Sequence, residues 1–318
     1  MSEPQAPPSL RDLESARDLI RTELLPTPLL PARAAGLGAL LLKPENLQRT
    51  GSFKFRGALH KLLRSLDAAR EHGVIAYSSG NHGQAVACAA QLLGCRCTVV
   101  MPEGGVREKQ EGVLSYGGEI VLAPEGSDAR KAMAEQRAAA EGLVLVPPYD
   151  DYEIMAGQGS VGLEIAEALP GVRQVLVPVG GGGLLAGTAI ALKALLPAVR
   201  LIAVEPAGAS DFWQSLRSGE RVSLPRVDTA ADGLRTQSVG ERNWPVLKAL
   251  VDEVVTVSED EILAGVRSLL WREKLVVEPS GAVTYAAFLA GHVAQDVPSV
   301  AVLSGGNIAR TYLQQVLG

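Results

Sequence analysis

The chain of 318 residues is 47 % hydrophobic and 20 % charged, which suits a protein with a large buried core and argues against extensive disorder. Its formal net charge is −5 and its Lys and Arg residues are scattered, so we expect no nucleic-acid partner. Three cysteines are too few for a disulfide framework and residues 1–8 lack the pattern of a signal peptide, so we expect reduced thiols and a cytoplasmic location.

One uncharged stretch, residues 175–192, approaches the length of a membrane span. Pro178 and the four glycines at 180–183 interrupt it, and a spanning helix must satisfy its own backbone hydrogen bonds. A strand, a glycine turn and a buried helix fit this stretch better. We therefore expect no membrane segment.

Amphipathic stretches and short apolar runs alternate along the chain, which predicts an α/β fold. We expect helices over residues 10–24, 54–66, 83–93, 106–116, 128–141, 152–168, 184–196, 209–218, 259–273 and 307–317. We expect strands at 40–42, 74–77, 98–101, 119–122, 143–146, 175–179, 201–204, 254–257 and 299–303. This order predicts parallel sheets in two lobes, with ligands beyond the carboxyl ends of the strands.

Three glycine-bearing turns fall at those strand ends: Ser78–Gly83, Gly180–Leu184 and Ser304–Asn307. Glycines let backbone N–H groups converge on one point, and the following helix adds the positive end of its dipole, an arrangement that suits a phosphate. The tetraglycine is neither a dinucleotide fingerprint nor a Walker A loop, because both spacings fail. The alternative is that these glycines only let a helix pack close to a sheet.

Lys54 stands between Phe53 and Phe55, an unusual place for a lysine that serves only as a solvated surface charge. Burial lowers the pKa of a lysine from about 10.4 and makes the amine a nucleophile near neutral pH. A reactive amine together with several backbone nests suggests a phosphorylated aldehyde held as an imine, which is pyridoxal phosphate (PLP).

The motifs together resemble the fold type II PLP enzymes (tryptophan synthase β-like), and most closely the serine racemases and serine/threonine dehydratases. The resemblance runs from about Thr27 to Asn307 and rests on the segments 52–58, 78–84, 156–159, 180–183, 231–233, 278–281 and 304–307. It implies two parallel-sheet α/β lobes with the cofactor between them. The large PLP-binding domain would comprise 1–66 and 148–318, the small domain 67–147, and the enzyme would be a homodimer.

The resemblance also implies the cofactor site. Lys54 would bond to the aldehyde, Phe53 would pack beside the ring, and Ser304 would meet the pyridine nitrogen. A serine hydroxyl stabilises a protonated ring less than a carboxylate does, so the ring is expected to be a weaker electron sink that favours β-elimination. The remaining cofactor-binding residues implied are Asn81 at the ring hydroxyl, the amides of Gly180, Gly181, Gly182, Gly183 and Leu184 at the phosphate, and Glu278.

The substrate would be a small hydroxy amino acid whose carboxylate sits on the turn containing Ser78, Ser79, Asn81 and His82, at a helix N-terminus. We expect His82 to orient groups there rather than to act as a base. Arg130 could bind a second carboxylate, although a surface salt bridge explains it equally well. Three other histidines show no ligand spacing and are expected at the surface: His60, His72 and His292.

The function implied is dehydration and deamination of L-serine and L-threonine to a 2-keto acid and ammonia. Lys54 would remove the α-proton, and Ser79 on the opposite face would return one to give D-serine, as in the racemases. Alternatively, Ser79 only binds the carboxylate or caps the helix. Two rival functions remain: a threo-3-hydroxyaspartate ammonia-lyase with the same machinery, and a silent binding homologue.

The residues alone favour helix capping for Glu205 and Asp211. The resemblance instead implies that Glu205, the Ala209 carbonyl and Asp211 hold an activating divalent cation, Mg²⁺ or else Ca²⁺ or Mn²⁺. An ATP effector site would involve Gln84, Lys274 and Asn307. Because nothing follows Gly318, we expect no regulatory domain and no feedback control by isoleucine.

Overall fold

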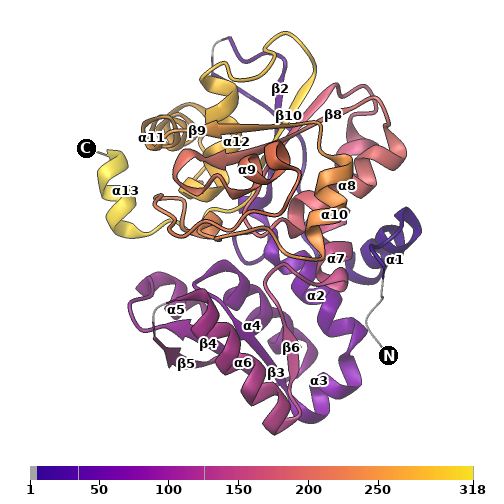
Figure 1. Cartoon of the computed structure of the whole chain (residues 1–318), viewed down its shortest axis with the longest axis vertical. Helices are drawn as coiled ribbons and strands as arrows, with labels where there is room; N and C mark the ends of the chain where they lie inside the picture. The colour runs from indigo at the N-terminus through magenta and orange to yellow at the C-terminus, as the bar shows by residue number, and fades with distance from the viewer. Residues whose placement is uncertain (1–5, 35, 125, 318) are drawn as a thin grey trace.

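Two separate sheets organise the chain, as the alternation of strands and helices predicts (Figure 1). The computed structural model describes residues 6–34, 36–124 and 126–317. Within these ranges the larger sheet has six strands in the order β1-β2-β10-β7-β8-β9, and every neighbouring pair except β1–β2 is parallel. Its strands are β1 (Leu30–Pro31), β2 (Leu40–Pro44), β7 (Gln174–Pro178), β8 (Arg200–Pro206), β9 (Glu253–Val257) and β10 (Ser299–Leu303).

The smaller sheet has four parallel strands in the order β5-β4-β3-β6. They are β3 (Val74–Tyr77), β4 (Cys97–Pro102), β5 (Glu119–Ala123) and β6 (Val144–Val146). All four lie inside residues 67–147, so we propose the expected division into a small domain over this range and a large domain over 1–66 and 148–318.

Four helices accompany the smaller sheet, in the lower half of Figure 1: α3 (Leu66–His72), α4 (Asn81–Leu93), α5 (Arg107–Ser115) and α6 (Ser127–Glu141). The others are α1 (Leu10–Ile20), α2 (Lys54–Arg64), α7 (Tyr152–Ala168), α8 (Gly183–Leu195), α9 (Asp211–Ser218), α10 (Asn243–Leu250), α11 (Glu259–Ser268), α12 (Pro279–Leu289) and α13 (Arg310–Leu317). Short 3₁₀ turns are η1 (Glu45–Leu47), η2 (Ala207–Ala209) and η3 (Asp232–Leu234), and η4 (Leu269–Glu273) is π-helical.

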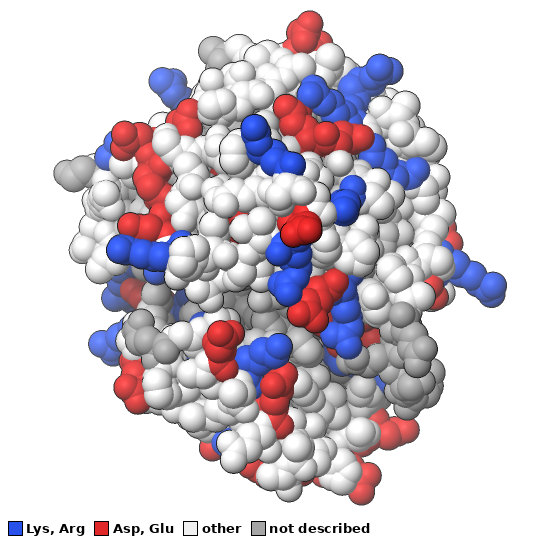
Figure 2. Space-filling view, viewed as in Figure 1, with Lys and Arg blue, Asp and Glu red and all other residues white. Residues whose placement is uncertain are grey.

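Basic and acidic side chains are interspersed over both lobes on the face shown in Figure 2. Among the residues described, no helix is both long and apolar enough to cross a membrane. Of the cysteines, Cys88 and Cys97 are buried and Cys95 is partly buried, and all three are free thiols.

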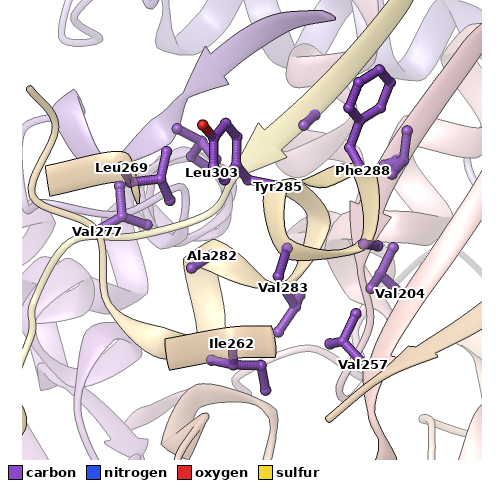
Figure 3. Close-up of a cluster of buried hydrophobic side chains, with 14 of the residues drawn as sticks. Val204, Val257, Ile262, Leu269, Val277, Ala282, Val283, Tyr285, Phe288 and Leu303 are labelled. Atoms are coloured by element: carbon purple, nitrogen blue, oxygen red, sulfur yellow. The ribbon is translucent and has the colours of Figure 1, made fainter. Parts of the chain in front are cut away.

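A helix buried on nearly all sides forms the centre of the core of the large lobe (Figure 3). Val283 and Phe288 on α12 belong to one cluster with Val204 on β8, Val257 on β9 and Ile262 on α11. Burying each such side chain contributes about 1.5–3 kcal/mol. Because α12 is apolar around its circumference, it has no amphipathic period, and the sequence does not predict it.

Where elements are amphipathic or flanked by clear turns, prediction and structure agree. The expected helix 152–168 and strand 299–303 match α7 and β10 to the residue. The helix expected over 259–273 is α-helical to Ser268 and then continues as the π-helical η4. The helix expected over 10–24 ends at Ile20, and α3 was not expected.

Glycines bring α2 and α7 into close contact between the two lobes. A Cβ atom on Gly157 would lie 2.7 Å from the Cα atom of Gly57. His60 lies on this face of α2, is 3 % exposed, and donates from Nδ1 to the Glu153 carbonyl oxygen at 2.8 Å. The expectation that His60 lies at the surface is therefore wrong, because α7 covers it. The other two histidines are exposed as expected: His72 and His292.

A fully buried guanidinium holds together the elements behind α2. Arg56 donates to Glu45 at 2.7 and 2.8 Å and to Glu164 at 2.6 and 2.9 Å. It also donates to Ser160 Oγ at 2.9 Å and to Thr27 Oγ1 at 3.1 Å. Burial alone lowers the pKa of Arg56, but the two carboxylates outweigh burial and raise it. The charge is therefore fully compensated.

Lys43 on β2 joins this network, since its Nζ atom donates to the Thr27 carbonyl at 2.6 Å and to the Glu164 carboxylate. Arg56 lies two residues after Lys54, so the network anchors the first turn of α2 against the large sheet. The position of the Lys54 backbone therefore depends on buried ion pairs.

Arg56→Met retains much of the side-chain volume but leaves the buried carboxylate of Glu45 without its guanidinium. Removing one partner of a buried ion pair costs about 3–5 kcal/mol, and we expect the free energy of unfolding in urea to fall by that amount. The matched control is Arg137→Met, which breaks a surface pair with Glu141 and should leave the unfolding midpoint unchanged. Equal midpoints for Arg56→Met and the wild type would contradict this assignment.

Candidate functional site

One cavity brings together the candidate residues from motifs far apart in the chain. It is lined by residues that follow β3, β7 and β10 and by the first turns of α2, α4 and α8. The carboxyl ends of these parallel strands thus meet at the site, as expected for α/β sheets. The candidate cofactor and substrate residues lining it are Phe53, Lys54, Ser78, Ser79, Asn81, His82, Arg130, Gly180, Gly181, Gly182, Gly183, Leu184, Glu278 and Ser304.

Lys54 is the first residue of α2 and faces this cavity. The Phe53 amide donates to the Ser304 carbonyl oxygen at 3.1 Å, which ties the start of the helix to the end of β10. The Lys54 Nζ atom donates to the Pro148 carbonyl oxygen at 2.6 Å and lies 5.1 Å from the centre of the Phe53 ring. A carbonyl and an aromatic face thus position the amine.

Burial lowers the pKa of Lys54 to about 8. An ordinary lysine titrates near 10.4, so a much larger fraction of this amine is neutral at physiological pH. A neutral amine is the form that attacks an aldehyde or accepts a proton. The environment of Lys54 thus supports both chemical roles that the sequence assigns to it.

The tetraglycine turn has a packing reason as well as a chemical one. A Cβ atom on Gly181 would lie 2.2 Å from the Tyr149 ring, so only glycine fits beneath that ring. Gly182 has φ +92°, in the left-handed region that favours glycine. The Gly181 carbonyl accepts from the Asn243 side chain at 2.6 Å and the Gly240 amide at 3.0 Å, which holds the peptide in one orientation.

The same turn ends at the first residue of α8, where no side chain caps the described helix. Its first N–H groups therefore remain available to an anion, and the helix dipole favours negative charge there. A second helix start, that of α4, lines the same cavity and also lacks a side-chain cap among the described residues. The donor set of one reactive amine and two uncapped helix starts fits PLP together with an amino-acid carboxylate.

The turn before α4 has the shape expected of an anion site. The Ser78 hydroxyl accepts from the Gly80 amide at 2.9 Å, and Ser79 is exposed to the cavity. His82 Nε2 bonds to the Val146 carbonyl oxygen at 2.8 Å, so Nε2 carries the proton and Nδ1 presents a lone pair. That Nδ1 atom is buried and has no partner within the described part of the chain.

His82 remains neutral at physiological pH. Burial, followed by the positive charge of Lys54, lowers the pKa of His82 to about 3. A base with so low a pKa is weak, which supports the orienting role expected of His82.

Ser304 and Asn81 occupy the cavity wall formed by the end of β10 and the start of α4. The Ser304 hydroxyl donates to the Ser280 carbonyl oxygen at 3.3 Å, a long bond that leaves its lone pairs available. Asn81 donates to the Glu278 carboxylate, and its Oδ1 atom accepts from Asn307 at 3.0 Å. The orientation of the Asn81 amide is thus defined from both sides.

Several lining residues were not expected from the sequence. Tyr149 and Pro148 contact the tetraglycine turn and Lys54 as described, and Lys109 bonds to Asp232 and Glu278. Asp232 stands in a motif that the resemblance includes, so the motif pointed to it. Nothing in the local sequence around Lys109 distinguishes it from a surface lysine on an amphipathic helix.

The candidate cation residues lie outside the cavity, where β8 ends and α9 begins. Both carboxylate oxygens of Asp211 are buried and lack a hydrogen-bond partner among described residues. The Glu205 carboxylate accepts from the amides of Phe212 at 3.0 Å and Trp213 at 2.7 Å. Burial raises the pKa of Asp211 to about 7, and burial and Asp211 raise the pKa of Glu205. Two undercompensated carboxylates fit a divalent cation.

The comparisons with known proteins agree with this geometry. Residues 20–305 match the family model described as "Pyridoxal-phosphate dependent enzyme". A catabolic L-threonine dehydratase of Staphylococcus aureus is 40 % identical over 97 % of this chain and 92 % of its own length. Maize serine racemase has a TM-score of 0.92 and 34 % identity, over 97 % of this chain and 96 % of its own. A threonine deaminase from the organism abbreviated T.th. has a TM-score of 0.88 and 44 % identity, over 94 % of this chain and 98 % of its own.

The lowered pKa of Lys54 can be measured directly. Reductive ¹³C-methylation of the cofactor-free protein, followed by NMR titration, should show one lysine signal with a midpoint near about pH 8, as the cited pKa implies. Surface lysines should titrate near about 10.4. The Lys54→Arg variant identifies the signal, which should disappear. A Lys54 signal that titrates with the surface lysines would contradict the desolvated environment.

Proposed function

The chain belongs to the family of pyridoxal-phosphate dependent enzymes, and on that premise we propose that it converts L-serine and L-threonine to a 2-keto acid and ammonia. The observation that carries the proposal is the Lys54 amine, bonded to the Pro148 carbonyl and with its pKa lowered to about 8, in one cavity with Ser79 and two uncapped helix starts. The similarity to threonine dehydratases supports the choice of substrate.

The residues that would hold the cofactor are those of the cavity. The amides from Gly180 to Leu184 would bind the phosphate, Phe53 would flank the ring, Asn81 would meet the ring hydroxyl and Ser304 the pyridine nitrogen. Glu278 would act through Asn81, to which it is hydrogen-bonded. When bound, PLP supplies an electron-withdrawing system that acidifies the α-carbon of the amino acid.

Protein residues would supply binding and proton transfer. The amides of the turn Ser78–His82 and the start of α4 would hold the substrate carboxylate. The neutral Lys54 amine would accept the α-proton, and the β-hydroxyl would leave as water. Hydrolysis then restores one water molecule, so that serine gives pyruvate and ammonia, and threonine gives its methyl homologue. Positioned acid–base groups of this kind contribute about 10²–10⁴ in rate.

Ser79 is proposed to give the enzyme a second, racemase activity. Its side chain is exposed to the same cavity that Lys54 faces. A hydroxyl opposite the lysine would return a proton to the other face of the α-carbon and produce D-serine. Similarity to maize serine racemase supports this proposal. The alternative is that Ser79 binds only the substrate carboxylate.

The two rival functions predict different outcomes in the same assay. An ammonia-lyase for threo-3-hydroxyaspartate would place Arg130, which lines the cavity, against the second carboxylate of its substrate. A silent binding homologue would need no activated amine, and the lowered pKa of Lys54 argues against it. Arg130 is on α6 of the small lobe, so it approaches from the side opposite the tetraglycine turn.

The proposed activity is tested by incubating the holoenzyme with L-serine, L-threonine and L-threo-3-hydroxyaspartate and measuring keto acid, ammonia and D-enantiomer. We expect keto acid from serine and threonine, and its loss in Lys54→Ala. The Lys193→Met variant is the control, because Lys193 pairs with Asp252 away from the cavity. Keto acid from hydroxyaspartate alone would favour the lyase alternative, and none from any substrate would favour a silent homologue.

Ser79→Ala separates the two proposed activities. We expect D-serine formation to fall by about 10²-fold or more, the range for loss of one acid–base group, while ammonia release from L-serine continues. The measurements are chiral chromatography and an ammonia assay on the same sample. Equal loss of both products would assign Ser79 to carboxylate binding, and unchanged D-serine would reject the two-base proposal.

We also propose that Glu205, the Ala209 carbonyl and Asp211 bind a divalent cation that stabilises the large lobe. Adding Mg²⁺, Ca²⁺ or Mn²⁺ to EDTA-treated protein should raise the Tm by about 5 °C at saturating concentration. Asp211→Asn should abolish the rise, whereas Asp228→Asn, a surface residue paired with Arg226, should retain it. A rise that persists in Asp211→Asn would place the cation elsewhere.

The ATP site and the homodimer remain proposals from the family resemblance. None of the three ATP candidates lines the cavity: Gln84, Lys274 and Asn307. Asn307 nevertheless donates to Asn81, and Gln84 lies on the same helix, so a ligand bound near them would contact residues adjacent to the cofactor site.

A further inference from the structure

One ammonium group joins the two lobes across the cavity. Lys109 lies on α5, beside the smaller sheet, and its Nζ atom donates to Asp232 Oδ2 at 2.6 Å and Glu278 Oε2 at 3.2 Å. Asp232 begins η3 and Glu278 precedes α12, and both elements belong to the larger lobe. All three side chains line the cavity. We call these three residues the interlobe clamp.

The interlobe clamp is a buried ionic group rather than a surface salt bridge. The Lys109 and Glu278 side chains are 4 % and 2 % exposed, and that of Asp232 is 23 % exposed. Burial lowers the pKa of Lys109, but Glu278 and Asp232 outweigh it and raise the pKa above its ordinary value. Breaking such a pair leaves an uncompensated buried charge, so the clamp holds the two lobes together only while all its members remain in place.

Two glycines make room for the clamp. A Cβ atom on Gly80 would lie 2.3 Å from Cδ of Lys109, and one on Gly305 would lie 2.3 Å from Oε1 of Glu278. The φ angle of Gly80 is 177°, an extended conformation that any residue adopts, so its backbone alone does not require glycine. The lysine stem therefore explains the glycine in the middle of the proposed substrate-binding turn.

The clamp acts on a cofactor-site residue through Glu278. One carboxylate oxygen of Glu278 accepts from Lys109, and the other accepts from the side-chain amide of Asn81. Asn307 completes the chain by donating to Asn81 at 3.0 Å. Because the ionised Glu278 only accepts hydrogen bonds, it directs the NH₂ group of Asn81 toward itself and defines the orientation of that amide.

We propose that Lys109 is a positioning residue that holds the lobes closed and, through Glu278 and Gly80, orients Asn81 and the Ser78–His82 turn toward the cofactor. This inference rests on the proposed function in taking PLP as the occupant of the cavity. Lys109 makes its contacts with protein groups, so its effect on the cofactor is indirect.

The test compares Lys109→Met with the wild type as holoenzymes. Lys109→Met keeps an unbranched stem and removes the charge. We expect the dissociation constant for PLP, measured by equilibrium dialysis, to rise by about 2- to 30-fold, the range of coupling through a network of this kind. Hydrogen exchange of the amides in residues 78–84 should accelerate as the turn loses its support.

Lys193→Met is the matched control. Lys193 donates to Asp252 at 2.6 Å, the same distance as in the clamp, but its contacts stay within the larger sheet and its helix. We expect its PLP affinity and its exchange in residues 78–84 to equal those of the wild type. Neither readout requires turnover, so failure of the clamp and failure of the proposed deamination are distinguishable.

A double-mutant cycle keeps the inference testable if Lys109→Met does not fold. Gly80→Ala should weaken PLP binding by pushing the Lys109 stem out of place, and it should have no further effect in the Lys109→Ala background, where the stem is absent. A PLP affinity within about twofold of the wild type in Lys109→Met, below the coupling expected of such a network, overturns the proposal. Equal losses from Gly80→Ala in both backgrounds overturn it as well.

Discussion

The architecture of the site depends on one buried guanidinium. Arg56 joins Glu45 behind the large sheet to Glu164 on α7, and it lies two residues from Lys54 on the same helical turn. A buried charge of this kind tolerates little displacement, because each lost hydrogen bond leaves an ionised group in an apolar environment. The start of α2 is therefore rigidly placed, and from it the Lys54 amine reaches the Pro148 carbonyl.

Exclusion of water from the cavity gives that amine its chemical character. The same burial lowers the pKa of Lys54 and the pKa of His82, and the positive charge of Lys54 lowers that of His82 further. The site thus contains a neutral imidazole and an amine that is readily deprotonated. Ser304, at the end of β10, offers a hydroxyl rather than a carboxylate to the proposed ring nitrogen. These features together favour elimination, which needs proton removal but no strongly stabilised carbanion.

Glycine in this chain marks places where a distant side chain approaches the backbone. Gly181 accommodates the Tyr149 ring, Gly80 accommodates the Lys109 stem, and Gly157 accommodates α2. By contrast, Gly182, with φ +92°, needs glycine for its own backbone conformation. The motifs therefore record the shape of neighbouring elements as much as they record anion binding, and the two interpretations of the tetraglycine turn are complementary. Packing holds the peptides in place, and the held N–H groups remain available to a phosphate.

The sequence by itself determined the α/β class, the alternation of elements and the family, and it identified the cofactor and substrate candidates that the cavity brings together. Hydrophobic period and strand-end turns are local properties of the chain, and parallel sheets bring strand ends together. Only the tertiary structure decided the burial of His60, the helix α12 and the ion pairs of Lys109, whose partner Glu278 is 169 positions away. Such contacts follow from how lobes and helices pack, and a lysine on an amphipathic helix carries no local sign of the carboxylates that it will meet.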